Sequence, residues 1–134
     1  MSDILEKDVW YPDEKLVLEV HKTILEKYGG WQGYERGIDV FSHILADAKK
    51  AKGIYNKAAV FLRQLVSGRI FVDGNHRTAQ AITKIFLEMN NAQMKVQETE
   101  EIIRFIKHIL EYNLEQIAEW LENGVTKRSN QSVP

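Results

Sequence analysis

Five consecutive residues, Asp73-Gly-Asn-His-Arg77, combine side chains that could bind an anion, and they stand directly before an amphipathic segment. The apolar spacing of that segment predicts a helix, and the first turn of a helix has N–H groups without an internal partner. Helix dipoles favour negative charge at that end, where phosphate is a common ligand. Gly74 permits a sharp turn and a close approach, and Asn75 tolerates unusual backbone angles and can donate a side-chain N–H.

Arg77 is the strongest indication of an anion in this loop. A cation at a helix start opposes the dipole, typically by about 0.3–1 kcal/mol, and His76 is a second potential cation there. Arg77 also offers a planar fork that binds phosphate oxygens in pairs. Asp73 would repel a phosphate unless a cation lay between them, and Mg²⁺ is commonly held by one or two carboxylates plus phosphate oxygens. The residues therefore predict a phosphate site with Asp73 as a candidate magnesium ligand.

An ordinary capped turn is the alternative explanation of the same residues. Asp-Gly-Asn is a common turn sequence, and Asp73 could simply cap the following helix. Arg77 could then pair with Glu35 or Glu88 on a neighbouring surface. In either case we expect Phe71 to anchor the loop in the core. Spacing and chemistry alone leave both interpretations open.

The composition describes an ordinary globular protein. The chain has 134 residues, which fits one domain with its own hydrophobic core, and 44% of them are hydrophobic. Cysteine is absent, which excludes disulfides and thiolate metal sites. A formal net charge of −1 gives no reason to expect direct nucleic-acid or membrane binding through bulk charge. The sequence has neither a membrane-spanning apolar run nor a signal-peptide pattern at its start, so a cytoplasmic protein is expected.

Apolar residues at helical spacing predict about six helices and almost no strand, an all-α bundle. Capping signals place the first helix between Asp13 and Gly29, and the last between an Asn113/Gln116 capping box and Gly124. The helices between them are expected to end near Gly53, to break at Ser67-Gly68, to resume after Arg77 as far as Asn90, and to start again at a Thr99 cap. The inward positions are expected to include Val17, Val20, Ile24, Tyr28, Phe41, Ile44, Leu45, Ala48, Tyr55, Ala58, Ala59, Leu62, Leu65, Val66, Ala79, Ile82, Ile85, Phe86, Met89, Ile102, Ile103, Ile106, Ile109 and Leu110.

The remaining segments carry weaker signals. Residues 93–96 are expected to be a short extended piece. We expect residues 1–124 to form a single domain and residues 125–134 to be a polar, disordered tail. Trp31, in a glycine-rich stretch, could stack on a base, contact a partner or pack the loop. His21 is isolated in the sequence and is expected to be structural or exposed.

The stretch Phe71-Val-Asp-Gly-Asn-His-Arg-Thr-Ala79 resembles the signature loop of the Fic/Doc family, His-x-Phe-x-Asp/Glu-Gly/Ala-Asn-Gly/Lys-Arg. The resemblance runs from about Asp13 to Leu121 and implies a Fic-type (Fido) helical bundle with this loop between two central helices. Tyr28-Gly29-Gly30, and the Thr-Ala pair after the motif arginine, are similar to the short Doc-like members. Those are death-on-curing type toxins of toxin–antitoxin pairs.

The resemblance implies a role for each loop residue. Asp73 would hold Mg²⁺, Gly74 and Asn75 would shape the anion cradle and contact phosphates, and Arg77 would bind the phosphate chain of ATP. Fic proteins transfer a nucleoside monophosphate, usually AMP, to a protein hydroxyl, whereas Doc-type toxins transfer a phosphate to a translation factor. The position of His76 is lysine in phosphate-transferring and glycine in AMP-transferring members, so the transferred group stays open. A nucleotide, a protein target and an antitoxin protein are the implied partners.

Arg69 departs from the family pattern, because it occupies the position of the family's catalytic histidine. Arginine keeps its proton at physiological pH and cannot act as a general base, a role that typically contributes about 10²–10⁴-fold. Three interpretations follow: a nucleotide-binding pseudoenzyme in which Arg69 adds a phosphate contact, an enzyme with a different base, or a chain carrying an inactivating substitution. A catalytically inactive nucleotide- or partner-binding module is therefore the alternative to a transferase.

Overall fold

The computed structural model describes residues 5–126, and in that range the chain forms six α-helices, two short 3-10 turns and no strand. The all-α fold class is therefore confirmed. The helices are α1 (Glu14–Tyr28), α2 (Val40–Lys50), α3 (Ile54–Ser67), α4 (Asn75–Met89), α5 (Thr99–Lys107) and α6 (Leu114–Asn123), and the turns are Glu6–Asp8 and Ile109–Glu111.

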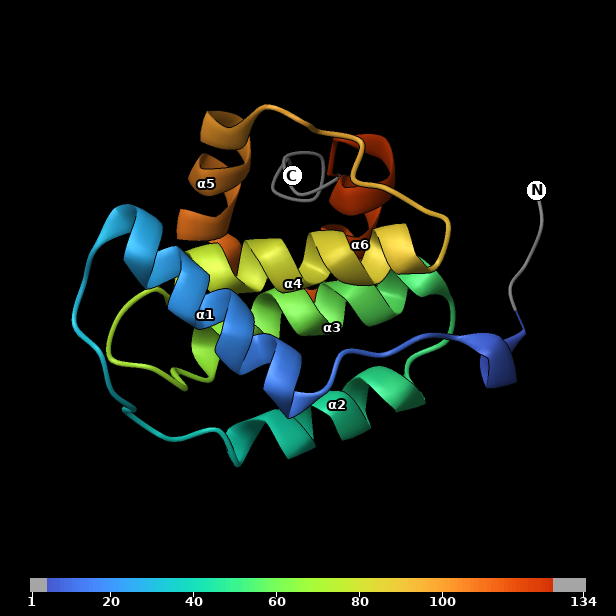
Figure 1. The fold of residues 1–134 in the computed structure, drawn as a ribbon. Coiled ribbons are helices and arrows are strands. Elements are labelled where there is room, and N and C mark those ends of the chain that lie inside the picture. The colour runs from blue at the N-terminus through green and yellow to red at the C-terminus, as the bar shows by residue number, and fades with distance from the viewer. Residues whose placement is uncertain (1–4, 127–134) are drawn as a thin grey trace.

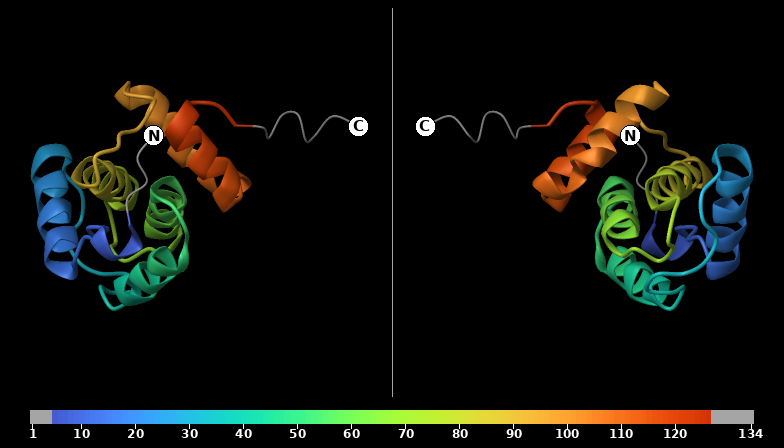
Figure 2. Two further views of the ribbon diagram at one scale, coloured as in Figure 1. Left: turned by 90° about the vertical axis from the view of Figure 1, so that its right-hand side faces the viewer. Right: turned by 90° about the vertical axis from the view of Figure 1, so that its left-hand side faces the viewer.

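The two central helices are α3 and α4, which lie side by side (Figure 1). Helices α1 and α2 pack on one side of this pair and α5 and α6 on the other (Figure 2). Helix α3 contacts α2, α4 and α6, and it therefore buries apolar residues over most of its circumference. The loop that joins α3 to α4 connects the two central helices, as the family resemblance implied.

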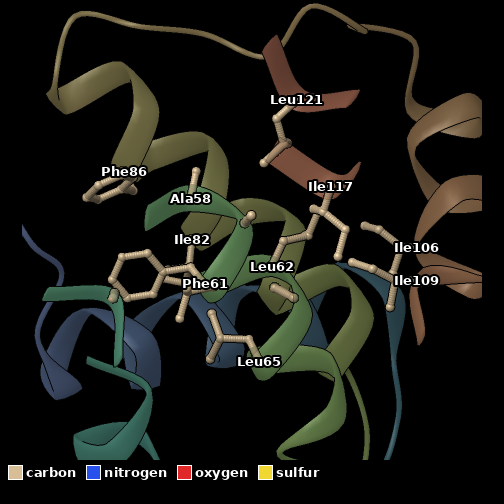
Figure 3. Packing of buried hydrophobic residues seen from close by; sticks show 14 of the residues in the cluster. Ala58, Phe61, Leu62, Leu65, Ile82, Phe86, Ile106, Ile109, Ile117 and Leu121 are labelled. Atoms are coloured by element: carbon tan, nitrogen blue, oxygen red, sulfur yellow. The ribbon is translucent and has the colours of Figure 1, made fainter. Parts of the chain in front are cut away.

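Aromatic and branched side chains fill the space between the central helices. The ring of Phe61 on α3 lies 5.0 Å from that of Phe86 on α4, and Ile82 packs beside them (Figure 3). On the far side of α3, Leu62 meets Ile117 of α6. All five side chains are fully buried, so the pair that carries the loop is firmly held.

Local capping signals in the sequence predicted several helix ends correctly. A carboxylate oxygen of Asp13 accepts a hydrogen bond from the N–H of Leu16 at 2.9 Å, and α1 stops at Gly29 with φ of +79°. The capping box of Asn113 and Gln116 is present at the start of α6. Gly124 ends α6 in the left-handed conformation, where glycine carries no steric penalty.

Other local expectations were wrong. Glu98, one residue before Thr99, caps α5 by accepting from the N–H of Glu101. Tyr28, Met89 and Leu110 were expected to face inward, but each is about half exposed because it lies where its helix ends or leaves the core. Residues 93–96 form neither helix nor strand; the Lys95 N–H donates to the carbonyl oxygen of Leu121, and the Tyr55 hydroxyl donates to that of Gln93. Of the expected tail, residues 127–134 lie outside the described residues, and the domain boundary stays a prediction.

A buried lysine joins α2, α3 and the N-terminal segment. The Lys57 side chain of α3 is fully buried, and its ammonium group donates to carbonyl oxygens of Ala48, Lys49 and Ala51 at the end of α2. It also forms an ion pair of 2.8 Å with Glu6. Burial opposes the charged ammonium, but the hydrogen bonds with Glu6 and Tyr11 outweigh it and raise the pKa of Lys57.

None of the helices in residues 5–126 combines the length and the apolar character that crossing a membrane requires.

Candidate functional site

The α3–α4 loop is paired along one edge with the glycine-rich segment that follows α1. The N–H groups of Glu35 and Gly37 both donate to the carbonyl oxygen of Ile70, at 3.0 and 3.1 Å. Tyr34 and Phe71 form an antiparallel bridge. The connection between α1 and α2 accordingly runs beside the α3–α4 loop in Figure 1. This pairing fixes the position of the loop before the helix begins.

The side chain of Asn75 closes the loop on itself. Its Oδ1 accepts from the N–H of Phe71 at 3.1 Å, and its Nδ2 donates to the carbonyl oxygen of Phe71 at 2.7 Å. The Phe71 ring is buried with 2% exposure, as expected for an anchor. Asn75 therefore shapes the loop, and one of its side-chain N–H groups is already used there.

Helix α4 begins at Asn75, so Asn75, His76 and Arg77 form its first turn instead of preceding it. Within residues 5–126, the backbone N–H groups of these three residues have no hydrogen-bond partner. Gly74 precedes them in the left-handed conformation, with φ of +84°. The helix therefore presents an uncapped positive end, which is the geometry that binds anions.

Asp73 does not cap α4, so the capped-turn interpretation is wrong. Its Oδ2 accepts instead from the backbone N–H of Trp31 at 2.7 Å. Gly30 makes this approach possible, because a Cβ at Gly30 would lie 3.2 Å from the Cβ of Asp73. The second carboxylate oxygen of Asp73 has no partner among the described residues. One carboxylate oxygen is therefore available beside the open end of α4.

A single carboxylate fits a magnesium ion only in the company of other oxygen ligands. In residues 5–126 no group of three histidine, aspartate or glutamate residues could hold a metal ion by itself. Mg²⁺ bound with a nucleotide takes one or two protein carboxylates, and phosphate and water oxygens complete its shell. Asp73 matches that donor set, so an ion at this position would arrive with its phosphate ligand.

Arg77 stacks on an aromatic ring and forms no ion pair within the described part of the chain. The pairing with Glu35 or Glu88, which belonged to the capped-turn alternative, does not form. Its guanidinium carbon lies 3.7 Å from the centre of the Tyr28 ring. Stacking uses the face of the guanidinium, and its N–H groups lie in the plane of the group. The edge of Arg77 remains suited to bind phosphate oxygens.

Arg69 is held by a two-pronged ion pair with Glu35. The Nε of Arg69 donates to one carboxylate oxygen of Glu35, and the Nη2 donates to the other at 3.0 Å. The hydrogen bond from Arg69 lowers the pKa of Glu35, and the same bond raises the pKa of Arg69. Arg69 therefore keeps its proton and cannot act as a general base. Its charge is directed to Glu35, which weakens the interpretation of Arg69 as an added phosphate contact.

His76 contributes less positive charge than the sequence suggested. The residue is exposed overall, but partial burial of its ring lowers its pKa, and the nearby charges of Lys107 and Arg69 lower it further. Both effects favour the neutral form of its ring. Arg77 is left as the cation of the first turn.

His21, which was expected to be structural or exposed, is structural, and the sequence did not indicate that it contacts this loop. It is buried with 7% exposure, its Nε2 lies 2.8 Å from the carbonyl oxygen of Asp73, and its ring stacks on Phe71 at 3.5 Å. A Cβ at Gly74 would lie 3.3 Å from this ring, which explains the glycine better than a close approach to ligand. The available signal was spacing, since His21 lies one turn after the buried Val17.

Trp31 lies beside the loop without packing it. Its side chain is 77% exposed, which excludes packing of the loop from the three roles left open for it, and its backbone N–H donates to Asp73. The exposed indole stays available to a ligand or a partner.

The site as a whole can bind an anionic group and hold it in a fixed place. It combines the uncapped start of α4, one arginine without an acidic partner and one available carboxylate oxygen, on a loop pinned along its edge and at its anchor.

A family model, described as the Fic/DOC family, matches residues 11–87, which cover α1, the loop and nearly all of α4. No curated protein matches the chain.

Proposed function

Because the chain belongs to the Fic/DOC family, we propose that the first turn of α4 binds the phosphates of a nucleotide such as ATP. The family suggests transferase activity on proteins in general. The chain's own geometry supports the binding half of such a reaction, because the first turn of α4 has unpaired N–H groups and Arg77 has no acidic partner among residues 5–126.

The observation that carries this proposal is the pairing of an uncapped helix start with Arg77. A cation in the first turn opposes the helix dipole, and no acidic side chain of residues 5–126 neutralises it. An arriving phosphate would accept hydrogen bonds from the N–H groups of the turn and from the edge of the guanidinium. The unpaired N–H groups and the charge of Arg77 would then share one anionic partner.

Asp73 is the proposed magnesium ligand. Its available oxygen would bind the ion, while the N–H of Trp31 holds the other oxygen and so fixes the orientation of the carboxylate. When bound, Mg²⁺ supplies charge neutralisation for the phosphates. The Asn75 side chain would keep the loop in shape during binding, since it is tied to both backbone groups of Phe71.

Group transfer would require a proton to leave the hydroxyl of a protein target, and Arg69 cannot receive it. Transfer of a phosphate or of AMP by this chain is therefore expected to be slow unless another base acts. We propose that the chain is a Doc-like toxin that acts on a translation factor. We further propose that an antitoxin protein restrains it and that it acts in the cytoplasm. The resemblance of residues 28–30 and 71–79 supports that context.

A non-catalytic nucleotide-binding module is the second candidate function. The Arg69–Glu35 ion pair favours it, because it fills the base position with a permanently charged group that already has its partner. The two candidates share the phosphate site and differ only in turnover on a protein target.

Titration calorimetry of ATP with and without Mg²⁺ tests the shared site. We expect binding that depends on Mg²⁺ and that Arg77→Ala weakens about tenfold to a hundredfold, as for loss of charged hydrogen bonds. Arg77→Lys, which keeps the charge without the fork, should fall between the two. Arg104→Ala on the exposed face of α5 is the matched control. Absence of binding at millimolar ATP would show that the first turn of α4 is not a phosphate site.

A further inference from the structure

Helix α1 buries a smaller share of its residues than any other helix in residues 5–126. Only Val17 and His21 of its 15 residues are buried, whereas α4, which has the same length, buries six. Helix α1 lies on the outside of the bundle and packs chiefly on α4 (Figure 2). A segment with few buried apolar side chains opens at a lower free-energy cost than the core does. The contacts at the two ends of α1 therefore decide how firmly it is held.

The N-terminal end of α1 is held by residues 9–13, which we call the strap. Asn90, at the C-terminal end of α4, bonds to both backbone groups of Trp10 in the strap. Its Oδ1 accepts from the Trp10 N–H at 2.9 Å, and its Nδ2 donates to the Trp10 carbonyl oxygen at 3.0 Å. Asn90 is 5% exposed. The next strap residue, Tyr11, places its ring 6.0 Å from that of Phe86 on α4. Specific contacts thus attach the strap to one end of α4.

The C-terminal end of α1 is attached to the loop and to the first turn of α4. The ring of Tyr28 stacks on the guanidinium of Arg77. Three residues further on, the backbone N–H of Trp31 donates to the carboxylate of Asp73. This attachment and that of the strap lie at opposite ends of α4, about 20 Å apart at about 1.5 Å per residue. Helix α1 itself spans the distance between them.

Helix α1 contains no glycine or proline, so nothing in its sequence favours a bend between its two attachments. We propose that the strap and α1 open as one unit, so that release of the strap from Asn90 also frees Tyr28 and Trp31 from the phosphate site. In the closed state these two residues orient Arg77 and Asp73, and in the open state neither contact exists. The strap thus controls, from one end of α4, the shape of the site at the other end.

The opening has a consequence for nucleotide binding, and this consequence rests on the proposed function. Phosphates that bind where Arg77 and Asp73 are oriented favour the closed state. By reciprocity, the factor by which ATP stabilises the closed state is the factor by which loss of that state weakens ATP binding. The opening itself is measured without a ligand, so a failure of the strap is distinguishable from a failure of the phosphate site.

Native-state amide hydrogen exchange of the free chain tests the opening. The amides of Val20 and Leu25 lie in the two halves of α1. The amide of Leu62, which is fully buried on the central helix α3, reports on unfolding of the whole chain. In the parent chain we expect Val20 and Leu25 to exchange through openings of equal free energy, lower than that of Leu62. Equal protection of all three amides would overturn the proposal, because α1 would then open only with the core.

Three variants loosen α1 from either end. Asn90→Ala removes both bonds to Trp10 and should speed exchange at the two α1 amides by the same factor, about tenfold, as for the loss of two hydrogen bonds. Tyr11→Ala releases the strap without a change in α4 and should act in the same direction. Tyr28→Leu, at the far end of α1, should speed both amides about twofold to fivefold. A change confined to one of the two amides would overturn the proposal, because the two ends of α1 would then open separately.

Gln97→Ala is the matched control, because it removes a side-chain hydrogen bond to the carbonyl oxygen of Met94 that an opening of α1 leaves intact. It should leave the exchange of both α1 amides unchanged. Saturating ATP with Mg²⁺ should slow both amides in the parent chain and not in Arg77→Ala. ATP that binds in calorimetry but leaves both rates unchanged would overturn the coupling. ATP that does not bind would reject the phosphate site, and the strap would still stand or fall by the rates in Asn90→Ala and Tyr28→Leu.

Discussion

The guanidinium carbon of Arg77 lies 3.7 Å from the centre of the Tyr28 ring, which joins the last residue of α1 to the first turn of α4. Tyr28 is 47% exposed, so burial does not account for its position. A ring on one face of the guanidinium restricts the rotation of the side chain and leaves its N–H edge for a ligand. Tyr28 is thus a positioning residue for the proposed phosphate site.

Replacing Tyr28 by Leu should weaken Mg²⁺-dependent ATP binding about twofold to fivefold, because an exposed cation–π contact contributes about 0.5–1 kcal/mol. Tyr28→Phe keeps the ring and should bind as the parent chain does, in titration calorimetry at constant ionic strength. Equal binding by the Leu and Phe variants would show that the stack does not position Arg77. The melting temperature of each variant controls for loss of fold.

Acidification should release the segment of residues 33–37 from the loop. The hydrogen bond from Arg69 lowers the pKa of Glu35 below its ordinary value of 4.5. A lowered carboxyl pKa in the folded state contributes stability above the ordinary value, and that contribution is lost as the pH falls through the lowered pKa. The segment should therefore be held fully above about pH 5 and loosen below about pH 4.

Amide hydrogen exchange of Gly37, whose N–H donates to Ile70, measures that release. Its protection, corrected for intrinsic exchange, should fall below about pH 4 in the parent chain. Glu35→Gln cannot form the ion pair, so it should show the lower protection already at pH 7 and little further change. Equal protection in both chains at pH 7 would mean that the backbone hydrogen bonds hold the segment without the ion pair.

Local signals in the sequence predicted the helices, because caps and apolar spacing act over a few residues. Asp13 and the Asn113/Gln116 box are examples in which neighbours in sequence make the decisive contacts. The loop residues could be named for the same reason. Their partners could not be named, because Trp31 and Asp73 lie 42 positions apart and only the fold brings them together.

The partner of the Arg77 side chain could not be predicted for the same physical reason. Arg77 offered two acidic partners by composition, but Glu35 is paired with Arg69, 34 positions further along the chain. The sequence contains no information on which of several arginines a glutamate will reach. The contact of His21 with the loop could not be predicted, because a single histidine on an apolar helix face has no local pattern that identifies its partner.

Lys57→Met should destabilise the protein by about 3 kcal/mol, because it leaves Glu6 and several carbonyl oxygens at the end of α2 without their donor. Methionine has a similar length, so a large cavity is not the cause. Urea unfolding followed by circular dichroism measures the loss. Lys50→Met, at an exposed position of α2, should change the free energy of unfolding by less than about 0.5 kcal/mol. Similar effects of the two substitutions would contradict the capping role of Lys57.

Arg69→His should turn a binding protein into a transferase, if the rest of the site is competent. The substitution removes the guanidinium from Glu35 and places an imidazole where a base is needed, and a general base contributes about 10²–10⁴-fold. Arg69 has a positive φ of +48°, which His tolerates about as well as Arg does, so the loop should keep its shape.

The measurement is transfer of label from ATP to protein, with label on the α- and the γ-phosphate in separate reactions. Protein labelled from the α-phosphate alone would show AMP transfer, and label from the γ-phosphate alone would show phosphate transfer. Arg69→Gln also breaks the pair with Glu35 but supplies no base, so it separates release of the segment from catalysis. Labelling by Arg69→His that depends on Mg²⁺ and disappears in Arg69→His/Arg77→Ala would establish a dormant enzyme. No labelling, in a variant that still binds ATP, would favour the non-catalytic module.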